Sequence, residues 1–170
     1  NDALANNKLS IINTDAFIWI KECNFKYDFI IIDFPDPSNF SIGKLYSNSF
    51  YKQVKRILKE DGAFVVQSTS PYVARKSFWC VNNTIASVGL STLPYHLYVP
   101  SFGEWGYVLA FQKLQDVPYY LPKDLKFYDE SRFQEMISFP KDMGYEMTEI
   151  NKLNNQILIH YFEDEWATVL

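Results

Sequence analysis

The feature of this sequence that most restricts its fold is a run of four apolar residues, Phe29 to Ile32, followed directly by an acid, Asp33. A short continuous apolar run is typical of a strand that is buried on both faces, as in the parallel sheets of α/β proteins. A second acid, Asp36, follows between Pro35 and Pro37. Because ligands of open parallel sheets bind just outside the carboxyl ends of the strands, this acid–proline turn is a candidate site.

Strand and helix patterns alternate along the chain up to residue 111. Such alternation, closed by a hairpin, predicts a doubly wound α/β sheet with an antiparallel edge. In chain order we first expect a strand at 9–13, a helix begun by Thr14 or Asp15, and the buried strand at 29–32. A helix over 47–62, capped by Ser49 and ended by Gly62, leads to a strand from 63. A helix from Ser70-Pro71 to Gly89 and hairpin strands at 91–99 and 104–111 follow.

The character of the sequence changes after about Gln112. The remainder is rich in loop residues, with helical patterns near 130–137 and 155–166. Its aromatic residues need burial, so we expect it to pack on the preceding part. The sequence therefore predicts an α/β domain over residues 1–111 and a small, mostly helical appendage over residues 112–170.

Composition excludes several classes of protein. The 170 residues are 48% hydrophobic, which argues against disorder, and the net charge of −4 argues against binding to nucleic acid. No apolar run approaches the roughly 18 residues of a membrane span, and no signal peptide is visible. Cys23 and Cys80 lack metal-ligand spacing, which indicates reduced thiols in a cytoplasmic protein. The chain starts Asn1-Asp2-Ala3, without methionine, so we expect a processed product or a fragment.

Three predicted strands end in polar residues. Asp33 and Asp36 follow one strand, Gln67 ends its neighbour, and Asp15 follows a third. These residues are common in turns, and Asp33 with its prolines can be explained as turn chemistry alone. Polar groups at three strand ends of one sheet edge nevertheless indicate a site. Two carboxylates three residues apart can converge on one cation.

The aromatic residues and histidines have less specific explanations. Tyr95, Tyr98, Phe102 and Trp105 surround the predicted hairpin turn, either as half-buried core or as the wall of an amine pocket. His96 and His160 have no partners at metal or catalytic-triad spacing. We interpret both histidines as structural and expect no metal site.

Three segments together resemble the polyamine aminopropyltransferases, the spermidine synthase family. They are "YDFIIIDFPDP", "LYSNSFYKQVKRILKEDGAFVVQSTSP" and "LPYHLYVPSFGEWGYVLA". The resemblance runs from about Leu9 to Ala110. It is greatest to a bacterial subgroup in which this domain follows a membrane-embedded N-terminal half. It implies a Rossmann-like sheet of the class I methyltransferase type, here lacking its first two strands.

The resemblance also implies a reaction. Decarboxylated S-adenosylmethionine donates its aminopropyl group to putrescine or a related amine and leaves as methylthioadenosine, with no prosthetic group. By the same resemblance Asp33 is the catalytic aspartate, whose carboxylate orients the attacking amine and accepts its proton. The remaining implied roles are amine binding by Asp36, Gln67 and Trp105, and donor binding by Asp15, Ala16, Pro37 and Leu45. We also expect Phe102 to bind the amine, as an aromatic wall of its pocket.

Two departures from the family pattern limit what the resemblance implies. Pro100-Ser101-Phe102 stands where the family has an amine-binding tyrosine, so the acceptor amine stays open. The family's glycine-rich loop and its ribose-binding acid would precede Asn1. We therefore expect this chain alone to be inactive, with residues 9–13 displaced or paired with another chain.

Two other functions stay open at this point. One is a class I S-adenosylmethionine methyltransferase, which shares the sheet, and the other is a catalytically dead scaffold module. The sequence is compatible with a homo-oligomer, and the small-molecule polyamine is the expected partner.

Overall fold

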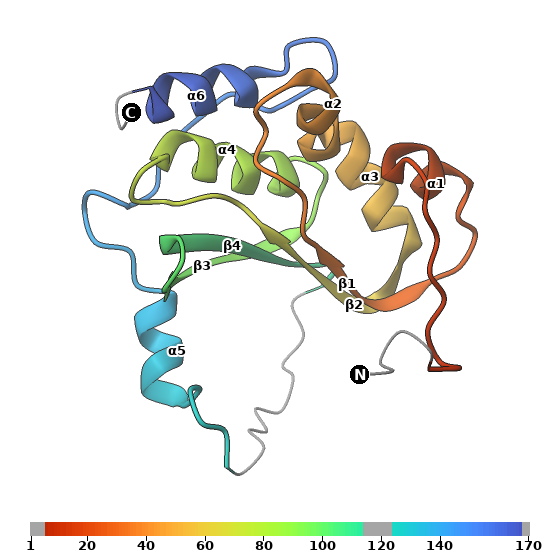
Figure 1. Cartoon of the computed structure of the whole chain (residues 1–170), viewed down its shortest axis with the longest axis horizontal. Coiled ribbons are helices and arrows are strands. Elements are labelled where there is room, and N and C mark those ends of the chain that lie inside the picture. Colours follow the sequence, from red (N-terminus) through yellow and green to blue (C-terminus); the bar gives the residue numbers. More distant parts are fainter. Residues whose placement is uncertain (1–5, 114–123, 168–170) are drawn as a thin grey trace.

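The computed structural model describes residues 6–113 and 124–167, which form a layered α/β structure (Figure 1). In these residues four strands form one mixed sheet in the order β1-β2-β4-β3. The strands are β1 (Tyr27–Ile32), β2 (Leu58–Gln67), β3 (Ser91–Val99) and β4 (Gly103–Phe111). β1 runs parallel to β2, and β4 runs antiparallel to both β2 and β3.

This register places the candidate residues at one edge of the sheet. Ile32, the last residue of β1, lies opposite Val66, so Asp33, the first residue after β1, lies beside Gln67, the last residue of β2. Gln67 in turn lies opposite Tyr107 on β4. The start of β4, directly after the hairpin turn, therefore lies beside the carboxyl ends of β1 and β2.

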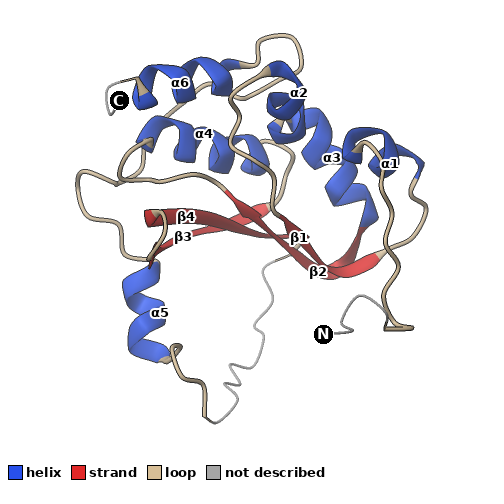
Figure 2. Ribbon diagram, in the orientation of Figure 1, coloured by secondary structure: helices blue, strands red, loops and turns tan. Residues whose placement is uncertain are grey.

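Most helices cover one face of the sheet. Figure 2 shows a helical layer above the strands, and α5 on the opposite side beside β3. The helical elements are α1 (Ala16–Glu22), α2 (Phe40–Gly43), the 3₁₀ helix η2 (Lys44–Tyr46), α3 (Asn48–Ile57), α4 (Arg75–Ala86), α5 (Glu130–Met136) and α6 (Ile157–Trp166).

The core lies between this helical layer and the sheet. The apolar stripe of α3, which includes Phe50, Val54 and Ile57, is buried, as periodic apolar spacing predicts. Tyr51 from α3 stacks on Phe64 from β2 with ring centroids 6.0 Å apart. The core thus fixes α3 against the strand that ends in Gln67.

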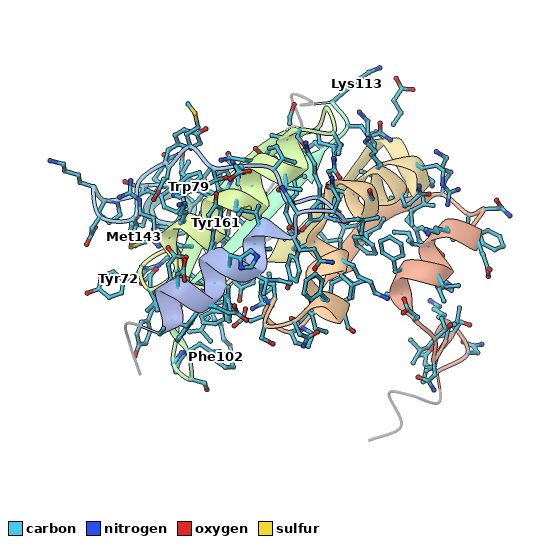
Figure 3. The ribbon with its side chains drawn as sticks, turned by 90° about the horizontal axis from the view of Figure 1, so that it is seen from above. Tyr72, Trp79, Phe102, Lys113, Met143 and Tyr161 are labelled. Atoms are coloured by element: carbon cyan, nitrogen blue, oxygen red, sulfur yellow. The ribbon has the colours of Figure 1, made fainter. Side chains whose placement is uncertain are left out.

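The part of the chain that follows α5 packs on α4. Trp79 donates a hydrogen bond from Nε1 to the Met143 carbonyl (3.0 Å), and these two residues lie together in Figure 3. The Glu165 carboxylate of α6 accepts from the amides of Lys76 and Ser77 at 2.6 and 3.0 Å. The helices expected near 130–137 and 155–166 are confirmed as α5 and α6. The division into two domains at residue 111 stays a prediction.

Residues 9–13 do not form the strand that their composition predicts, which agrees with the expectation that this segment is displaced in the chain alone. These residues have no regular structure, and Leu9, Ile11 and Ile12 are 47%, 59% and 59% exposed. A strand needs a neighbour for its backbone hydrogen bonds, and within the described residues none runs beside this segment. The expected burial of 29–32 on both faces is wrong, since Phe29 and Ile31 are exposed while Ile32 is buried. β1 is an edge strand here, and the helical layer covers one of its faces.

Helix boundaries differ from the sequence-based expectation at three points. Ser47, not Ser49, caps α3, because its Oγ accepts from the Phe50 amide at 3.3 Å. Gly62 does not end α3, because fully buried Leu58 already begins β2 and Gly62 lies within that strand. Ser70 caps a turn by accepting from the Val73 amide, and α4 starts later, at Arg75. The hairpin of β3 and β4 forms as expected. The helix α4 also ends before Gly89 as expected, and Gly89 has a φ of +76°.

Candidate active site

A cavity of about 830 Å³ opens at the carboxyl ends of β1 and β2. It lies where the segment Asp33 to Pro37, called the acid turn below, meets the end of β2, the hairpin and the end of α6. The lining residues are Asp33, Phe34, Pro35, Asp36, Gln67, Val99, Ser101, Phe102, Trp105, Tyr107 and Trp166. Two carboxylates therefore share a cavity whose other walls are largely aromatic.

The two acids of this cavity have different environments. Asp33 is exposed, whereas Asp36 is partly buried and its Oδ1 has no hydrogen-bond partner among the described residues. Burial raises the pKa of the Asp36 carboxyl above its ordinary value, and a hydrogen bond from Gln67 partly opposes this effect. A buried carboxylate oxygen without a partner is costly, so a cationic or hydrogen-bond-donating ligand would stabilise it.

Gln67 links the hairpin to the acid turn. With its amide oriented to satisfy both groups, its oxygen accepts from Trp105 Nε1 at 2.9 Å and its nitrogen donates to the Phe34 carbonyl at 2.7 Å. Phe34 lies between the two acids in the sequence. The Gln67 side chain therefore connects Trp105 with the backbone that carries Asp33 and Asp36.

A close backbone approach brings Trp105 to this position. The Gly106 amide donates to the Thr69 carbonyl at 2.7 Å, and the Ser68 amide donates to the Gly106 carbonyl at 2.9 Å. A Cβ on Gly106 would lie 2.5 Å from the Phe78 ring, so only glycine fits there without displacing its neighbours. Thr69 adopts a left-handed conformation, φ 61°, at the same crossing.

At the tip of the hairpin, Gly103 shapes the turn and Phe102 contacts Trp105. Gly103 has φ +76° and closes the turn that follows Val99. Phe102, labelled in Figure 3, packs on Trp105 with ring centroids 5.2 Å apart. The two aromatic residues predicted for the site thus form one wall of the cavity.

Four residues predicted to bind the donor do not line this cavity. The Asp15 carboxylate accepts from the Phe17 amide at 2.7 Å, which caps α1, and pairs with Lys44 at 2.7 Å. Lys44 and the Phe17 amide lower the pKa of Asp15. Ala16, Pro37 and Leu45 are partly or fully buried and pack against the core or the turn. Their role in ligand binding stays a prediction.

The structure adds site residues that the sequence reasoning missed. Tyr107 shares the cavity with Trp105, and its position two residues along the same strand could have predicted this. Burial and the nearby Asp33 charge raise the pKa of Tyr107, which stacks on Tyr95. Trp166 reaches the cavity from α6, and its Nε1 has no hydrogen-bond partner among the described residues. No local pattern marks Trp166, because only the packing of α6 places it there.

His96 has packing partners that fit a structural role, whereas His160 is exposed and its role stays a prediction. His96 Nδ1 contacts Glu104 Oε1, and its Nε2 lies 2.9 Å from the Ser138 carbonyl, so the ring joins the hairpin to the segment after α5. Across residues 6–113 and 124–167 no group of three or more histidine, cysteine or acidic side chains is arranged to hold a metal ion. In the same residues no helix has the length and apolarity needed to cross a bilayer.

Replacing Asp36 with asparagine should raise the midpoint of thermal unfolding (Tm) at pH 7. Because the folded pKa of Asp36 is raised, its contribution to stability is full below the ordinary aspartate pKa and is lost as the pH rises through the folded value. The neutral amide avoids this loss, so we expect a gain of a few degrees at pH 7 that disappears toward about pH 3. Calorimetry at both pH values measures it. A gain of the same size at both would show that ionisation of Asp36 is not its cause.

Comparison with known sequences gives a consistent result. A family model described as the spermine/spermidine synthase domain matches residues 1–120. A polyamine aminopropyltransferase of Leptospira interrogans is 49% identical over 169 residues, which are 99% of this chain and 34% of that protein. Polyamine aminopropyltransferase 2 of Ralstonia nicotianae is 44% identical and covers 99% of this chain and 33% of that protein. The chain thus spans about a third of the length of these relatives.

Solved structures show the same fold. A spermidine synthase in complex with the transition state analogue AdoDATO superposes with a TM-score of 0.70 at 25% identity, over 82% of this chain and 52% of that chain. The spermidine synthase from Thermotoga maritima gives 0.68 at 23% identity, over 82% of this chain and 51% of that chain. These matches confirm the predicted Rossmann-like α/β fold.

Proposed function

The chain belongs to the spermine/spermidine synthase domain family, and we propose that the protein transfers an aminopropyl group from decarboxylated S-adenosylmethionine to putrescine or a related amine. The observation that carries this proposal is the cavity that contains Asp33, Asp36 and Gln67 at the carboxyl ends of β1 and β2. Relatives that match the chain over nearly its whole length are named polyamine aminopropyltransferases.

The charges of the cavity fit the charges of the substrates. The donor is a sulfonium that carries a primary ammonium, and the acceptor is a polyamine, so both are cations. Asp33 and Asp36 supply two carboxylates on one wall, while Phe102 and Trp105 supply aromatic faces that bind cations and methylene groups. Asp36 Oδ1, which has no hydrogen-bond partner among the described residues, is the group that we assign to a substrate ammonium.

The proposed reaction is a displacement at the carbon next to sulfur. The amine nitrogen forms a bond to this carbon as the carbon–sulfur bond breaks. The electron pair of the broken bond stays on sulfur, which gives neutral methylthioadenosine. A free amine with a pKa of about 10 is protonated at pH 7 and must lose one proton before it attacks. We assign acceptance of the proton released from nitrogen to Asp33, which is exposed to the cavity. Holding nitrogen in line with the breaking bond supplies much of the rate.

The donor side of the site is proposed on the family pattern. Asp15 and Ala16 are assigned to the adenine, and Pro37 and Leu45 to the segment that lines it. Asp15 would keep its contact with the α1 amides and exchange part of its interaction with Lys44 for the ligand. We further propose that residues 1–111 act as the catalytic domain and residues 112–170 as an appendage that contributes Trp166 to the cavity.

We propose a cytoplasmic location, which agrees with two buried free cysteines among the described residues. Both substrates are small charged metabolites, so no macromolecular partner is required for the reaction.

Calorimetry with two donors separates this proposal from a methyltransferase. The full-length protein should bind decarboxylated S-adenosylmethionine at least about tenfold more tightly than the carboxylated form. The reason is that the extra carboxylate would face Asp33 and Asp36. Tighter binding of the carboxylated donor would overturn the assignment and favour methyl transfer.

A further inference from the structure

We propose that Tyr46 is a positioning residue. Its hydroxyl holds the backbone of the acid turn and so sets the positions of Asp33 and Asp36 during the reaction. Tyr46 lies outside the cavity lining and belongs to η2, ten or more residues after the acids. This inference rests on the proposed function for its consequence on rate, but its structural part can be tested separately.

The Tyr46 hydroxyl contacts two consecutive carbonyls of the turn. Its oxygen lies 3.2 Å from the Phe34 carbonyl oxygen and 3.1 Å from the Pro35 carbonyl oxygen. A phenol has one proton, so this proton is shared between two acceptors that lie between Asp33 and Asp36 in the sequence. A single buried side chain therefore fixes the orientation of both peptide groups.

The aromatic ring adds a second constraint on the same turn. Phe34 packs edge-on against Tyr46, with centroids 6.3 Å apart, and against Phe50 of α3, with centroids 5.6 Å apart. Tyr46 is only 1% exposed and is part of the hydrophobic core. The turn is thus held on one side by core aromatics and on the other by the Gln67 amide, which donates to the Phe34 carbonyl.

This arrangement keeps both carboxylates available to a ligand. The contacts that fix the turn are made by the carbonyls and the Phe34 ring, while Asp36 Oδ1 keeps no partner among the described residues and Asp33 faces the cavity. Burial, followed by the charges of Asp36 and Asp33, raises the pKa of Tyr46 well above its ordinary value. The hydroxyl consequently keeps its proton and remains a donor throughout the working pH range.

The neighbouring Tyr51 provides a matched control. It is also a core tyrosine, 0% exposed, one turn along in α3, but its hydroxyl has no hydrogen-bond partner among the described residues. Tyr46→Phe and Tyr51→Phe each delete one buried hydroxyl and leave the ring in place. Only the first deletion releases the acid turn.

The experiment compares both variants of the full-length protein with wild type in two measurements. In steady-state kinetics of aminopropyl transfer, Tyr46→Phe should lower kcat by about tenfold or more, since small displacements of reacting groups are costly, and leave the KM for the donor within about twofold. In amide hydrogen exchange, the Ser38 amide, which donates to the Asp36 carbonyl at 2.7 Å, should exchange on the order of tenfold faster. Tyr51→Phe should change neither quantity.

The two measurements separate the possible failures. If wild type transfers no aminopropyl group, the proposed function fails, and the exchange rate of Ser38 still decides whether Tyr46 holds the turn. Unchanged exchange at Ser38 in Tyr46→Phe overturns the inference, whatever the activity. Faster exchange with unchanged kcat overturns its catalytic part. A fall in kcat that Tyr51→Phe reproduces would show a general effect of core substitution and would also overturn it.

Discussion

In the full-length protein, Asp33→Asn should lower kcat for aminopropyl transfer by about 10²–10⁴-fold, the usual contribution of a positioned acid or base. Asparagine has nearly the same shape but cannot accept the proton that the amine releases. Asp33 lies in an exposed position directly after β1, so the substitution should leave the fold intact. Steady-state kinetics with putrescine and the decarboxylated donor measures the effect.

Asp28→Asn is the matched control for this substitution. Asp28 lies on β1, the strand that precedes Asp33, is largely exposed and pairs with Lys59 at 2.7 Å, away from the cavity. Its replacement should leave kcat unchanged, because surface ion pairs contribute little. Full activity of Asp33→Asn, or an equal loss in both variants, would contradict the assignment of Asp33 as the proton acceptor.

The second large effect concerns stability. Gly106→Ala should lower the free energy of unfolding by about 1–3 kcal/mol or more, the usual cost of overpacking a core. The added methyl group would lie 2.5 Å from Phe78 ring atoms and 2.8 Å from the Thr69 carbonyl oxygen. Since the backbone cannot yield without breaking the two hydrogen bonds around Gly106, β4 should move away from β2 at the site. Thermal or urea unfolding measures the loss.

Gly144→Ala provides the comparison for this change. A methyl group there would meet the nearest atoms at 3.5 Å, an ordinary van der Waals distance, in the loop between α5 and α6. We expect stability equal to or slightly above that of wild type. If Gly106→Ala unfolds at the same temperature as Gly144→Ala, the close approach of β4 to Thr69 does not hold the hairpin in place.

Local sequence signals predicted the elements that depend on neighbours along the chain. The hairpin of β3 and β4 and the helices α1, α5 and α6 form where capping, glycine and apolar spacing place them. Errors occurred where the outcome depends on distant partners. Residues 9–13 have the composition of a strand, but pairing decides whether a strand forms. Phe29 and Ile31 are exposed because no helix of the described residues covers that face of β1.

The same distinction holds for the candidate site. The acid turn and Gln67 were predicted because strand ends of one sheet meet at one edge. Phe102 and Trp105 were predicted because they lie around the hairpin turn, and the cavity contains all of these residues. Tyr46 and Trp166 could not be predicted in this way. Tyr46 reaches the turn through core packing, and Trp166 reaches the cavity because α6 packs on α4. The chemical roles of the predicted residues stay predictions until variants are assayed.

Identification of the reaction products tests aminopropyl transfer by this protein. The full-length protein is incubated with decarboxylated S-adenosylmethionine and putrescine, and the mixture is analysed by mass spectrometry. We predict spermidine, or the corresponding aminopropylated amine, and methylthioadenosine in equal amounts, with both formed at least about a hundredfold more slowly by Asp33→Asn. A parallel incubation contains S-adenosylmethionine in place of the decarboxylated donor. A methylated product in that incubation, or no methylthioadenosine from the decarboxylated donor with any diamine tested, would contradict aminopropyl transfer.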